Sequence, residues 1–106
     1  MRRRLIYRPK ALADLDDAEI YTRRTWGVQQ AKRYVGALVT DIKTLRRNAG
    51  RYPILDPVHP ALRRKRSAMH HIYFLIFDDR IEIVRIIHVQ RDPGLHLKVE
   101  TWRETE

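Results

Sequence analysis

The sequence predicts an α+β fold: an N-terminal strand, then an antiparallel helix hairpin packed on an antiparallel sheet. Apolar residues recur at helical spacing on both sides of Trp26-Gly27, where the pattern breaks. After a loop that contains three prolines, the apolar period falls to two. The length of 106 residues is typical of one domain, so we expect residues 1–106 to form a single unit.

The two helices are expected on either side of Gly27. The first should begin near Lys10, because Pro9 suits the first helical position, and Asp14 in its early turns complements the helix dipole. We expect Trp26 to close the far end of the hairpin. The second helix has the clearest periodicity, with apolar residues three and four apart at Val28, Ala31, Val35, Leu38, Ile42 and Leu45. Helices joined by so short a break form an antiparallel hairpin.

The expected sheet is built around residues 72–77, which are apolar on both faces and therefore predict a central strand. Further strands are expected over residues 3–7, 63–67, 81–88 and 95–99, the last as an added edge strand. Along the basic strand, Arg64 and Arg66 should face one side of the sheet, with Arg63 and Lys65 on the other.

Positive charge is in excess and unevenly distributed. The chain has 22 Lys and Arg against 13 Asp and Glu, a net charge of +9 with neutral histidines. Residues 46–66 contain seven positive groups and a single acid, Asp56. Basic blocks of this kind indicate a polyanion or an acidic protein as partner, and charge alone leaves both open, together with a merely solvated basic face.

Several classes of function find no support in the composition. The absence of cysteine excludes a disulfide framework, a thiolate nucleophile and a cysteine zinc site. No apolar run approaches the ~20 residues of a membrane span, so we expect a cytoplasmic protein without membrane contact. His70 and His71 should point to opposite faces of a strand, and no glycine-rich phosphate loop is present. We therefore expect no metal and no cofactor.

A series of short strings occurs in an order typical of one family. They are Pro9-Lys10-Ala11, Ile20-Tyr21, Trp26-Gly27, Gly50-Arg51, His71-Ile72-Tyr73-Phe74 and Arg85-Ile86-Ile87-His88 with Arg91-Asp92. In these strings the sequence resembles the ParE toxins of bacterial type II toxin–antitoxin modules, within the RelE/ParE superfamily, over nearly its whole length. Arg8 departs from the pattern, because family members often have Ser or Thr there to cap the first helix. We expect the missing cap to cost about 1 kcal/mol.

The resemblance implies a toxin that inhibits DNA gyrase by binding and is neutralised by a ParD-type antitoxin in a hetero-oligomer. No acid–base pair is evident in the sequence, which favours a binding poison over an enzyme. Direct binding to nucleic acid stays open. An antitoxin tail of apolar and acidic residues would dock on apolar positions of the helices that lie off the buried seam. The antitoxin-binding candidates are Leu12, Ile20, Tyr34 and Val39, and the target-binding candidates are Arg63, Arg64, Lys65, Arg66, Asp92 and Trp102.

The alternative that the superfamily implies is a RelE-like, metal-independent endoribonuclease acting on the ribosome. Such an enzyme needs a base, an acid and cationic groups at the phosphorane. The candidates are Arg63, Arg66, Arg85 and His88. In the nuclease branch a tyrosine recurs near the end of the last strand, but no tyrosine follows Tyr73 in this sequence. His88 is interpreted either as an acid–base group oriented by Asp92 or as part of a turn-fixing network of Arg85, His88 and Asp92. A third hypothesis is a nontoxic basic module that binds only its partner or nucleic acid.

Overall fold

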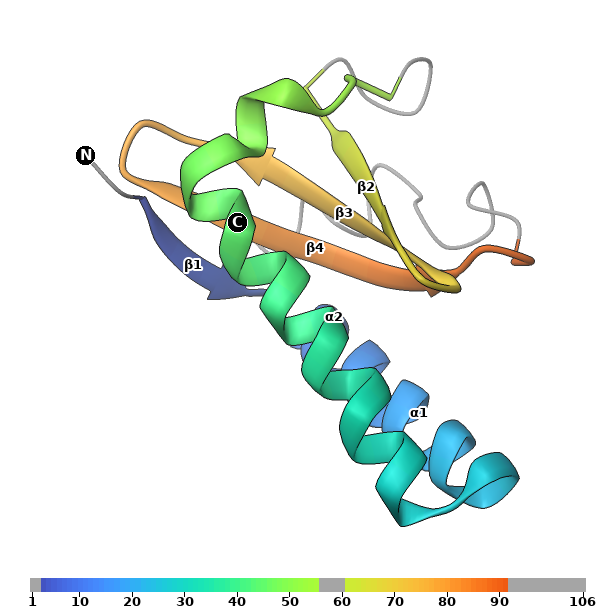
Figure 1. The fold of residues 1–106 in the computed structure, drawn as a ribbon. Helices are drawn as coiled ribbons and strands as arrows, with labels where there is room; N and C mark the ends of the chain where they lie inside the picture. The colour runs from blue at the N-terminus through green and yellow to red at the C-terminus, as the bar shows by residue number, and fades with distance from the viewer. Residues whose placement is uncertain (1–2, 56–60, 92–106) are drawn as a thin grey trace.

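The computed structural model describes residues 3–55 and 61–91, in which a helix hairpin covers one face of a four-stranded sheet (Figure 1). The strands are β1 (Arg4–Tyr7), β2 (Arg63–Ser67), β3 (His70–Ile76) and β4 (Arg80–His88). The helices are α1 (Pro9–Trp26), α2 (Val28–Asn48) and the short 3-10 helix η1 (Ala49–Arg51). The predicted α+β class is confirmed. The expected strand at 95–99 lies outside the described residues, as do Asp92 and Trp102.

The sheet has the order β1-β4-β3-β2. The strands β2, β3 and β4 pair antiparallel in sequence order, as predicted, whereas β1 joins β4 in parallel and makes the sheet mixed. The last pair between β1 and β4 is Tyr7 with Ile83, and the Arg8 N–H extends this contact to the Ile83 carbonyl at 3.0 Å. Because β4 continues to His88, its edge beyond Ile83 has no β1 residue beside it.

Gly27 reverses the chain between the two helices. Its backbone has φ 96° and ψ 170°, a conformation that residues with a side chain rarely adopt. The predicted seam of α2 is confirmed at Ala31, Leu38, Ile42 and Leu45, which are buried, whereas Val35 is half-buried and Val28 is exposed at the tip of the hairpin. The expectation for Trp26 is wrong: its side chain is 70% exposed, because the tip of the hairpin extends past the sheet (Figure 1).

Arg8 takes an unexpected role at the start of α1. It provides no side-chain cap, but its own side chain is buried, with only 3% of the residue exposed. Its Nε donates to Glu82 Oε1 at 2.8 Å, and Arg80 Nε donates to Glu82 Oε2 at 2.6 Å. Burial alone would raise the pKa of Glu82, but the hydrogen bonds and charges of Arg80 and Arg8 lower it below its ordinary value. Arg8, which replaces the usual capping residue, therefore joins the start of α1 to β4.

The interior forms two apolar clusters, one on each face of the sheet. The cluster under the helices joins Ala11, Ile42 and Leu45 to strand residues such as Phe74 and Ile83. The cluster on the other face contains no helical residue and consists of Leu62, Tyr73, Leu75, Val84 and Ile87. Burial on both faces confirms the prediction that residues 72–77 lie centrally. A register shift between Tyr73 and Phe74 leaves Val84 without an opposite residue on β3.

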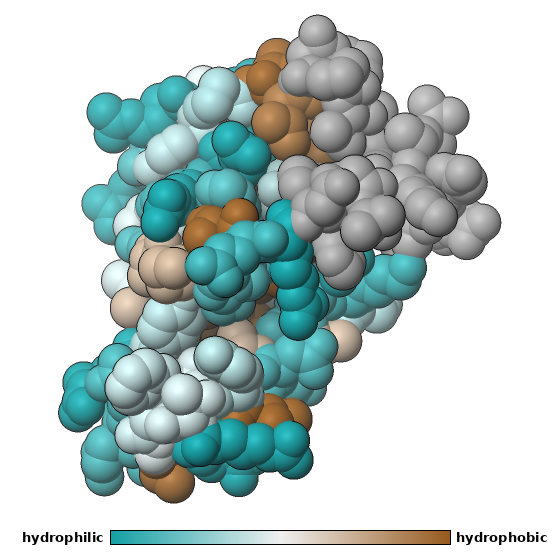
Figure 2. Space-filling model, turned by 90° about the vertical axis from the view of Figure 1, so that its right-hand side faces the viewer, coloured by the Kyte–Doolittle hydropathy of each residue, from teal (hydrophilic) through white to brown (hydrophobic). Residues whose placement is uncertain are grey.

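Some large apolar side chains remain exposed in the described part of the chain. They are Leu12, Tyr21, Trp26, Val28, Ile54 and Met69. The face shown in Figure 2 is mainly hydrophilic, and its apolar side chains form separate small patches rather than one continuous surface. A partner that binds this face must therefore combine apolar contacts with polar or charged ones.

Candidate functional site

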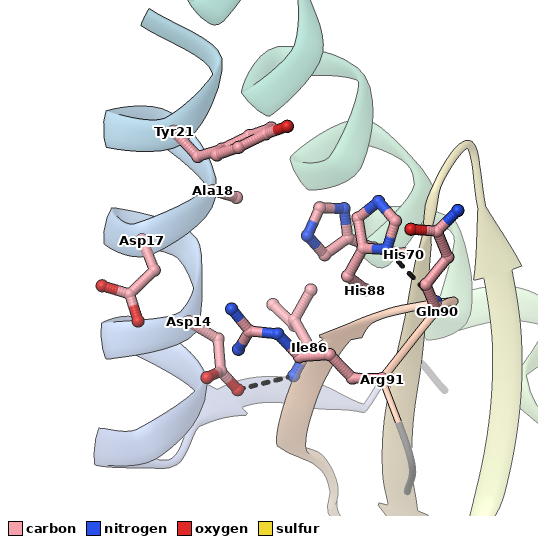
Figure 3. A pocket seen from close by; sticks show the side chains of 9 residues that line it. All are labelled: Asp14, Asp17, Ala18, Tyr21, His70, Ile86, His88, Gln90 and Arg91. Atoms are coloured by element: carbon pink, nitrogen blue, oxygen red, sulfur yellow. Dashed lines mark hydrogen bonds between the residues drawn. The ribbon is translucent and has the colours of Figure 1, made fainter. Parts of the chain in front are cut away.

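A groove runs between α1 and the end of β4. Its first part is a pocket of about 400 Å³ lined by Asp14, Asp17, Ala18, Tyr21, His70, Ile86, His88, Gln90 and Arg91 (Figure 3). A second pocket of about 250 Å³ shares Tyr21, His70 and His88 with it and continues to Trp26, Tyr34 and Met69. We call these two pockets together the groove. The conformation of Gly27 and the length of α1 place Tyr21 and Trp26 along one side, and the end of β4 forms the other.

Asp14 forms the floor of the groove at the open edge of β4. Its Oδ2 accepts the Ile86 N–H at 2.8 Å, so the carboxylate takes the place that a further residue of β1 would fill. The Arg85 guanidinium donates to both carboxylate oxygens, with Nε at 2.7 Å and Nη2 at 2.9 Å. Both side chains are largely buried, with 15% of Arg85 and 10% of Asp14 exposed. Such a bidentate pair fixes the distance between α1 and β4.

His70 is held in the groove by Tyr34. The Tyr34 hydroxyl accepts the Met69 N–H at 3.0 Å and lies 2.7 Å from Nδ1 of His70. A hydroxyl that accepts from Met69 keeps its own proton, and when it donates that proton to Nδ1 the ring proton of His70 is on Nε2. Burial, followed by the charge of nearby His88, lowers the pKa of His70 to about 4. His70 is therefore neutral near pH 7.

His88 lies beside His70 in an edge-to-face contact, with ring centroids 5.3 Å apart. Its Nδ1 accepts the Gln90 N–H at 3.1 Å, which leaves Nε2 as the ring N–H donor of His88. The Arg91 side chain extends from the end of β4 across the pocket toward α1 (Figure 3). The groove thus contains a cation, Arg91, and an N–H donor, Nε2 of His88. No pattern in the sequence predicted that these two groups lie together.

The network of Arg85, His88 and Asp92 stays a prediction, because Asp92 lies outside the described residues. Arg85 is paired with Asp14, and His88 accepts from the backbone of Gln90. The orientation of His88 by Asp92 likewise stays a prediction.

Two cations of the basic strand join β2 to the end of the helix hairpin. Arg63 Nη1 donates to the Tyr52 carbonyl at 2.6 Å and to the Gly50 carbonyl at 3.2 Å. Lys65 Nζ donates to Thr44 Oγ1 at 2.9 Å, and it lies over the Tyr52 ring at 5.2 Å from the centroid. These cations therefore hold the sheet against α2 and η1.

The other two cations of β2 belong to the opposite face. Arg64 pairs across the sheet with Tyr73 and Arg66 with His71, which confirms the predicted alternation. Arg66 Nε donates to the Ala68 carbonyl at 2.9 Å. Burial and the charges of Arg64 and Arg66 lower the pKa of His71. His70 and His71 lie on different faces, as expected, because His70 faces the helices.

The four nuclease candidates do not converge. His88 lies opposite His70, which lies opposite Ser67, so Arg63 is four residues away along β2. At the rise of a strand this separation is about 13 Å. Arg66 projects from the face opposite to His88, and Arg85 binds Asp14. This arrangement offers His88 no Arg partner from the candidate set.

The antitoxin-binding candidates differ in accessibility. Leu12 on α1 is 50% exposed, whereas Ile20 and Val39 are half-buried. Tyr34 is also half-buried, and its hydroxyl is bonded to the β2–β3 turn, so its replacement would disturb that turn. The sequence patterns missed the exposed Tyr21 and Trp26, because their exposure depends on how far the hairpin extends past the sheet, and they missed Met69, which lies in the turn between β2 and β3.

The described ranges, 3–55 and 61–91, contain neither a metal-binding cluster nor a helix that could span a membrane. No group of three or more His, Cys, Asp or Glu side chains there is arranged to hold a metal ion. Neither long helix in these ranges has the length and apolarity that crossing a membrane requires.

Comparisons with known proteins agree with this architecture. The family model described as "ParE toxin of type II toxin-antitoxin system, parDE" matches residues 5–93. Toxin ParE1 of Caulobacter vibrioides is 31% identical over 88 residues, which cover 83% of this chain and 91% of that protein. Toxin ParE of Escherichia coli is 33% identical over 84 residues, covering 78% of this chain and 82% of that protein.

Solved structures share the fold. A chain of the chromosomal ParDE system from P. aeruginosa superposes with a TM-score of 0.75 and 24% identity, over 84% of this chain and 98% of that chain. The YoeB dimer of Staphylococcus aureus gives a TM-score of 0.60 and 18% identity, over 83% and 98%. With the family model matching most of its length, the chain belongs to the ParE toxins of type II toxin–antitoxin systems.

Proposed function

We propose that this toxin inhibits DNA gyrase by binding it while its DNA is cleaved, and that a ParD-type antitoxin neutralises it in the cytoplasm. The observation that carries the proposal is the dispersal of the groups that RNA cleavage would require. Arg63 lies about 13 Å along the sheet from His88, and Arg85 is bound to Asp14. A binding poison needs a complementary surface and no such constellation.

The same dispersal weighs against the endoribonuclease alternative. General acid–base catalysis requires groups within hydrogen-bond reach of one substrate, and phosphorane stabilisation requires a cation at that place. The neighbouring His70 is neutral near pH 7, and Nδ1 of His88 already accepts a backbone N–H. Arg91 remains as a cation near His88, so the alternative keeps a definite test: ribosome-dependent cleavage that depends on His88 and Arg91.

The antitoxin partner follows from membership of a toxin–antitoxin family. The surface offers an antitoxin the half-exposed Leu12 on α1 and the exposed rings of Tyr21 and Trp26 along the groove. Because the face shown in Figure 2 is mainly hydrophilic with small apolar patches, a segment with both apolar and acidic residues fits best. The proposed complex is a hetero-oligomer of toxin and antitoxin.

The test is a supercoiling assay with purified gyrase, relaxed plasmid and toxin freed from antitoxin. We expect loss of supercoiling, accumulation of cleaved plasmid, and recovery on adding the antitoxin. A parallel reaction with translating ribosomes is expected to leave mRNA intact. Unimpaired supercoiling together with mRNA cut at codon positions would replace the proposal by the endoribonuclease. Normal growth on expression and no effect in either reaction would favour the nontoxic module.

A further inference from the structure

Charge is segregated in the part of the fold that the structure describes: many cations lie around β2, where the one carboxylate, Asp41, accepts from the Ser67 hydroxyl. Between residues 42 and 77, the described residues contain eight Lys and Arg and no Asp or Glu. The cations are Lys43, Arg46, Arg47, Arg51, Arg63, Arg64, Lys65 and Arg66. The described carboxylates other than Asp41 lie on α1, in the turn between β3 and β4, and on β4: Asp14, Asp16, Asp17, Glu19, Asp78, Asp79 and Glu82.

The fold brings the cations of two distant segments together. Arg63 Nη1 binds the Gly50 and Tyr52 carbonyls, which holds the start of β2 against η1. The end of α2 and η1 therefore lie at the same end of the sheet as the start of β2 (Figure 1). We call the resulting surface the basic edge. It consists of Arg46, Arg47 and Arg51 on α2 and η1, which lie on the helix side of the sheet, and of Arg64 and Arg66 on β2, which project from the opposite face of that outer strand.

The cations of the basic edge are accessible at the outer strand of the sheet. β2 is the last strand in the order β1-β4-β3-β2. Arg46, Arg47, Arg51 and Arg66 are exposed, and Arg64 is half-buried. Arg63 and Lys65, on the other face of β2, are held by oxygens of the neighbouring turn and helix, so the strand that presents Arg64 and Arg66 is fixed in place. A fixed strand presents its guanidiniums with less loss of conformational entropy on binding.

The partner of the basic edge can be inferred from the side chains that are missing there. Protein interfaces depend on a few aromatic or aliphatic anchors at their centre. Among the exposed large apolar residues of the described chain, Ile54 lies beside the start of β2 through its bridge to Arg63, and Met69 follows Ala68, which Arg66 contacts, but lines the groove. Tyr21 and Trp26 line the groove as well. Binding to phosphates requires positive charge and hydrogen-bond donors without such anchors.

We propose that the basic edge binds the phosphodiester backbone of nucleic acid, through Arg46, Arg47, Arg51, Arg64 and Arg66. All five cations of the basic edge are arginines. The planar guanidinium of arginine forms bidentate contacts with phosphate oxygens. Burial lowers the pKa of His71 on that face, and the charges of Arg64 and Arg66 lower it further. In its biological setting, the inference rests on the proposed function, because the nucleic acid would be the DNA that gyrase holds. Binding to free DNA does not depend on gyrase.

The experiment measures fluorescence anisotropy of a labelled duplex of mixed sequence with antitoxin-free toxin, between 50 and 200 mM salt. The logarithm of the association constant should fall linearly with the logarithm of salt, by about 0.9 per phosphate contact. The double variants R47Q/R51Q and R64Q/R66Q should each reduce that slope by about 1.8. The matched control K10Q/R24Q removes the same charge from exposed positions on α1 and should leave the slope unchanged. With single-stranded DNA or RNA, the logarithm of the association constant should fall by about 0.7 per phosphate contact.

The outcomes are distinct. No binding of wild type at 50 mM salt, or an equal slope change in the control, would overturn the proposal. Thermal unfolding of each variant verifies that the fold is retained. Loss of gyrase inhibition in R64Q/R66Q with unchanged affinity for DNA would assign the edge to an acidic protein surface instead. Failure of DNA binding with intact gyrase inhibition would remove this inference and leave the proposed function standing.

Discussion

Asp14 on α1 and Arg85 on β4, 71 residues apart in sequence, form a bidentate ion pair at the point where β1 no longer covers the edge of β4. The same carboxylate accepts the Ile86 N–H at 2.8 Å. One side chain therefore satisfies a strand edge, neutralises a largely buried guanidinium and sets the depth of the groove. The position of His88, two residues beyond Ile86, depends on this contact.

Replacing Asp14 with Asn should destabilise the protein by about 3 kcal/mol, because the mostly buried Arg85 would lose its charged partner. Urea unfolding monitored by circular dichroism measures the change. The control is Asp17→Asn, three residues along the same helix and exposed, for which a change within about 0.5 kcal/mol is expected. Equal effects of the two substitutions would show that Asp14 has no special structural role.

Replacing Arg8 with Ser tests the exchange of a helix cap for a buried ion pair. Serine would contribute about 1 kcal/mol as a cap, but it would remove one of the two guanidiniums that hold Glu82, at a cost of about 3 kcal/mol. We expect a net loss of about 2 kcal/mol in the free energy of unfolding. In the double variant R8S/E82Q the loss should be smaller than the sum of the two single losses. A variant R8S as stable as wild type would contradict this account.

The stability of the protein should depend on His70 at mildly acidic pH. Its folded-state pKa of about 4 lies below the 6.5 of an unfolded chain, so between these values the unfolded state binds one more proton. The free energy of unfolding should therefore fall as pH falls from 6.5 toward 4, on the order of 2 kcal/mol from this group. The titratable and charged groups that act on the pKa of His70 are His88, Asp14, Arg91 and His71.

Substitution isolates this contribution. His70→Gln should have a weaker pH dependence than wild type between pH 6.5 and 4, measured as the difference between urea unfolding curves at each pH. Below pH 4 both proteins should lose stability alike, because the depressed pKa of Glu82 contributes in that lower window. Parallel pH profiles of the two proteins from 6.5 to 4 would refute the assignment.

Leu12→Asp should weaken antitoxin binding at least tenfold, because a charge would replace a half-exposed apolar contact on α1. Isothermal titration calorimetry with the antitoxin measures the affinity, and circular dichroism verifies that the helices are retained. Ala13→Asp places the same charge on the next, exposed residue and serves as the control. If both variants bind the antitoxin as tightly as wild type does, the antitoxin docks elsewhere.

Features set by local sequence were predictable here. The three- and four-residue spacing of α2 and the break at Gly27 defined the hairpin, and the doubly apolar run at 72–77 identified an inner strand. The alternation of β2 separated Arg63 and Lys65 from Arg64 and Arg66. Each of these depends on periodicity over neighbouring residues.

Features set by contacts distant in sequence were not predictable. Asp14 was expected to complement the dipole of α1, but α1 begins at Pro9 and the carboxylate lies beyond its first turn, bound to Arg85. That pairing follows from the parallel addition of β1, which no local pattern encodes. The pairing of Arg8 with Glu82 and the contact of His70 with His88 likewise arise from the assembled sheet.

The most direct test of the central claim, a binding poison rather than a catalyst, is the stoichiometry of gyrase inhibition. Cleaved gyrase–DNA complex is quantified at fixed gyrase while toxin is increased from far below to above an equal molar amount. We predict that the complex increases in proportion to toxin and reaches a plateau near one toxin per gyrase active unit. No cleaved complex at excess toxin, with mRNA cut by amounts of toxin far below those of ribosomes, would contradict the account.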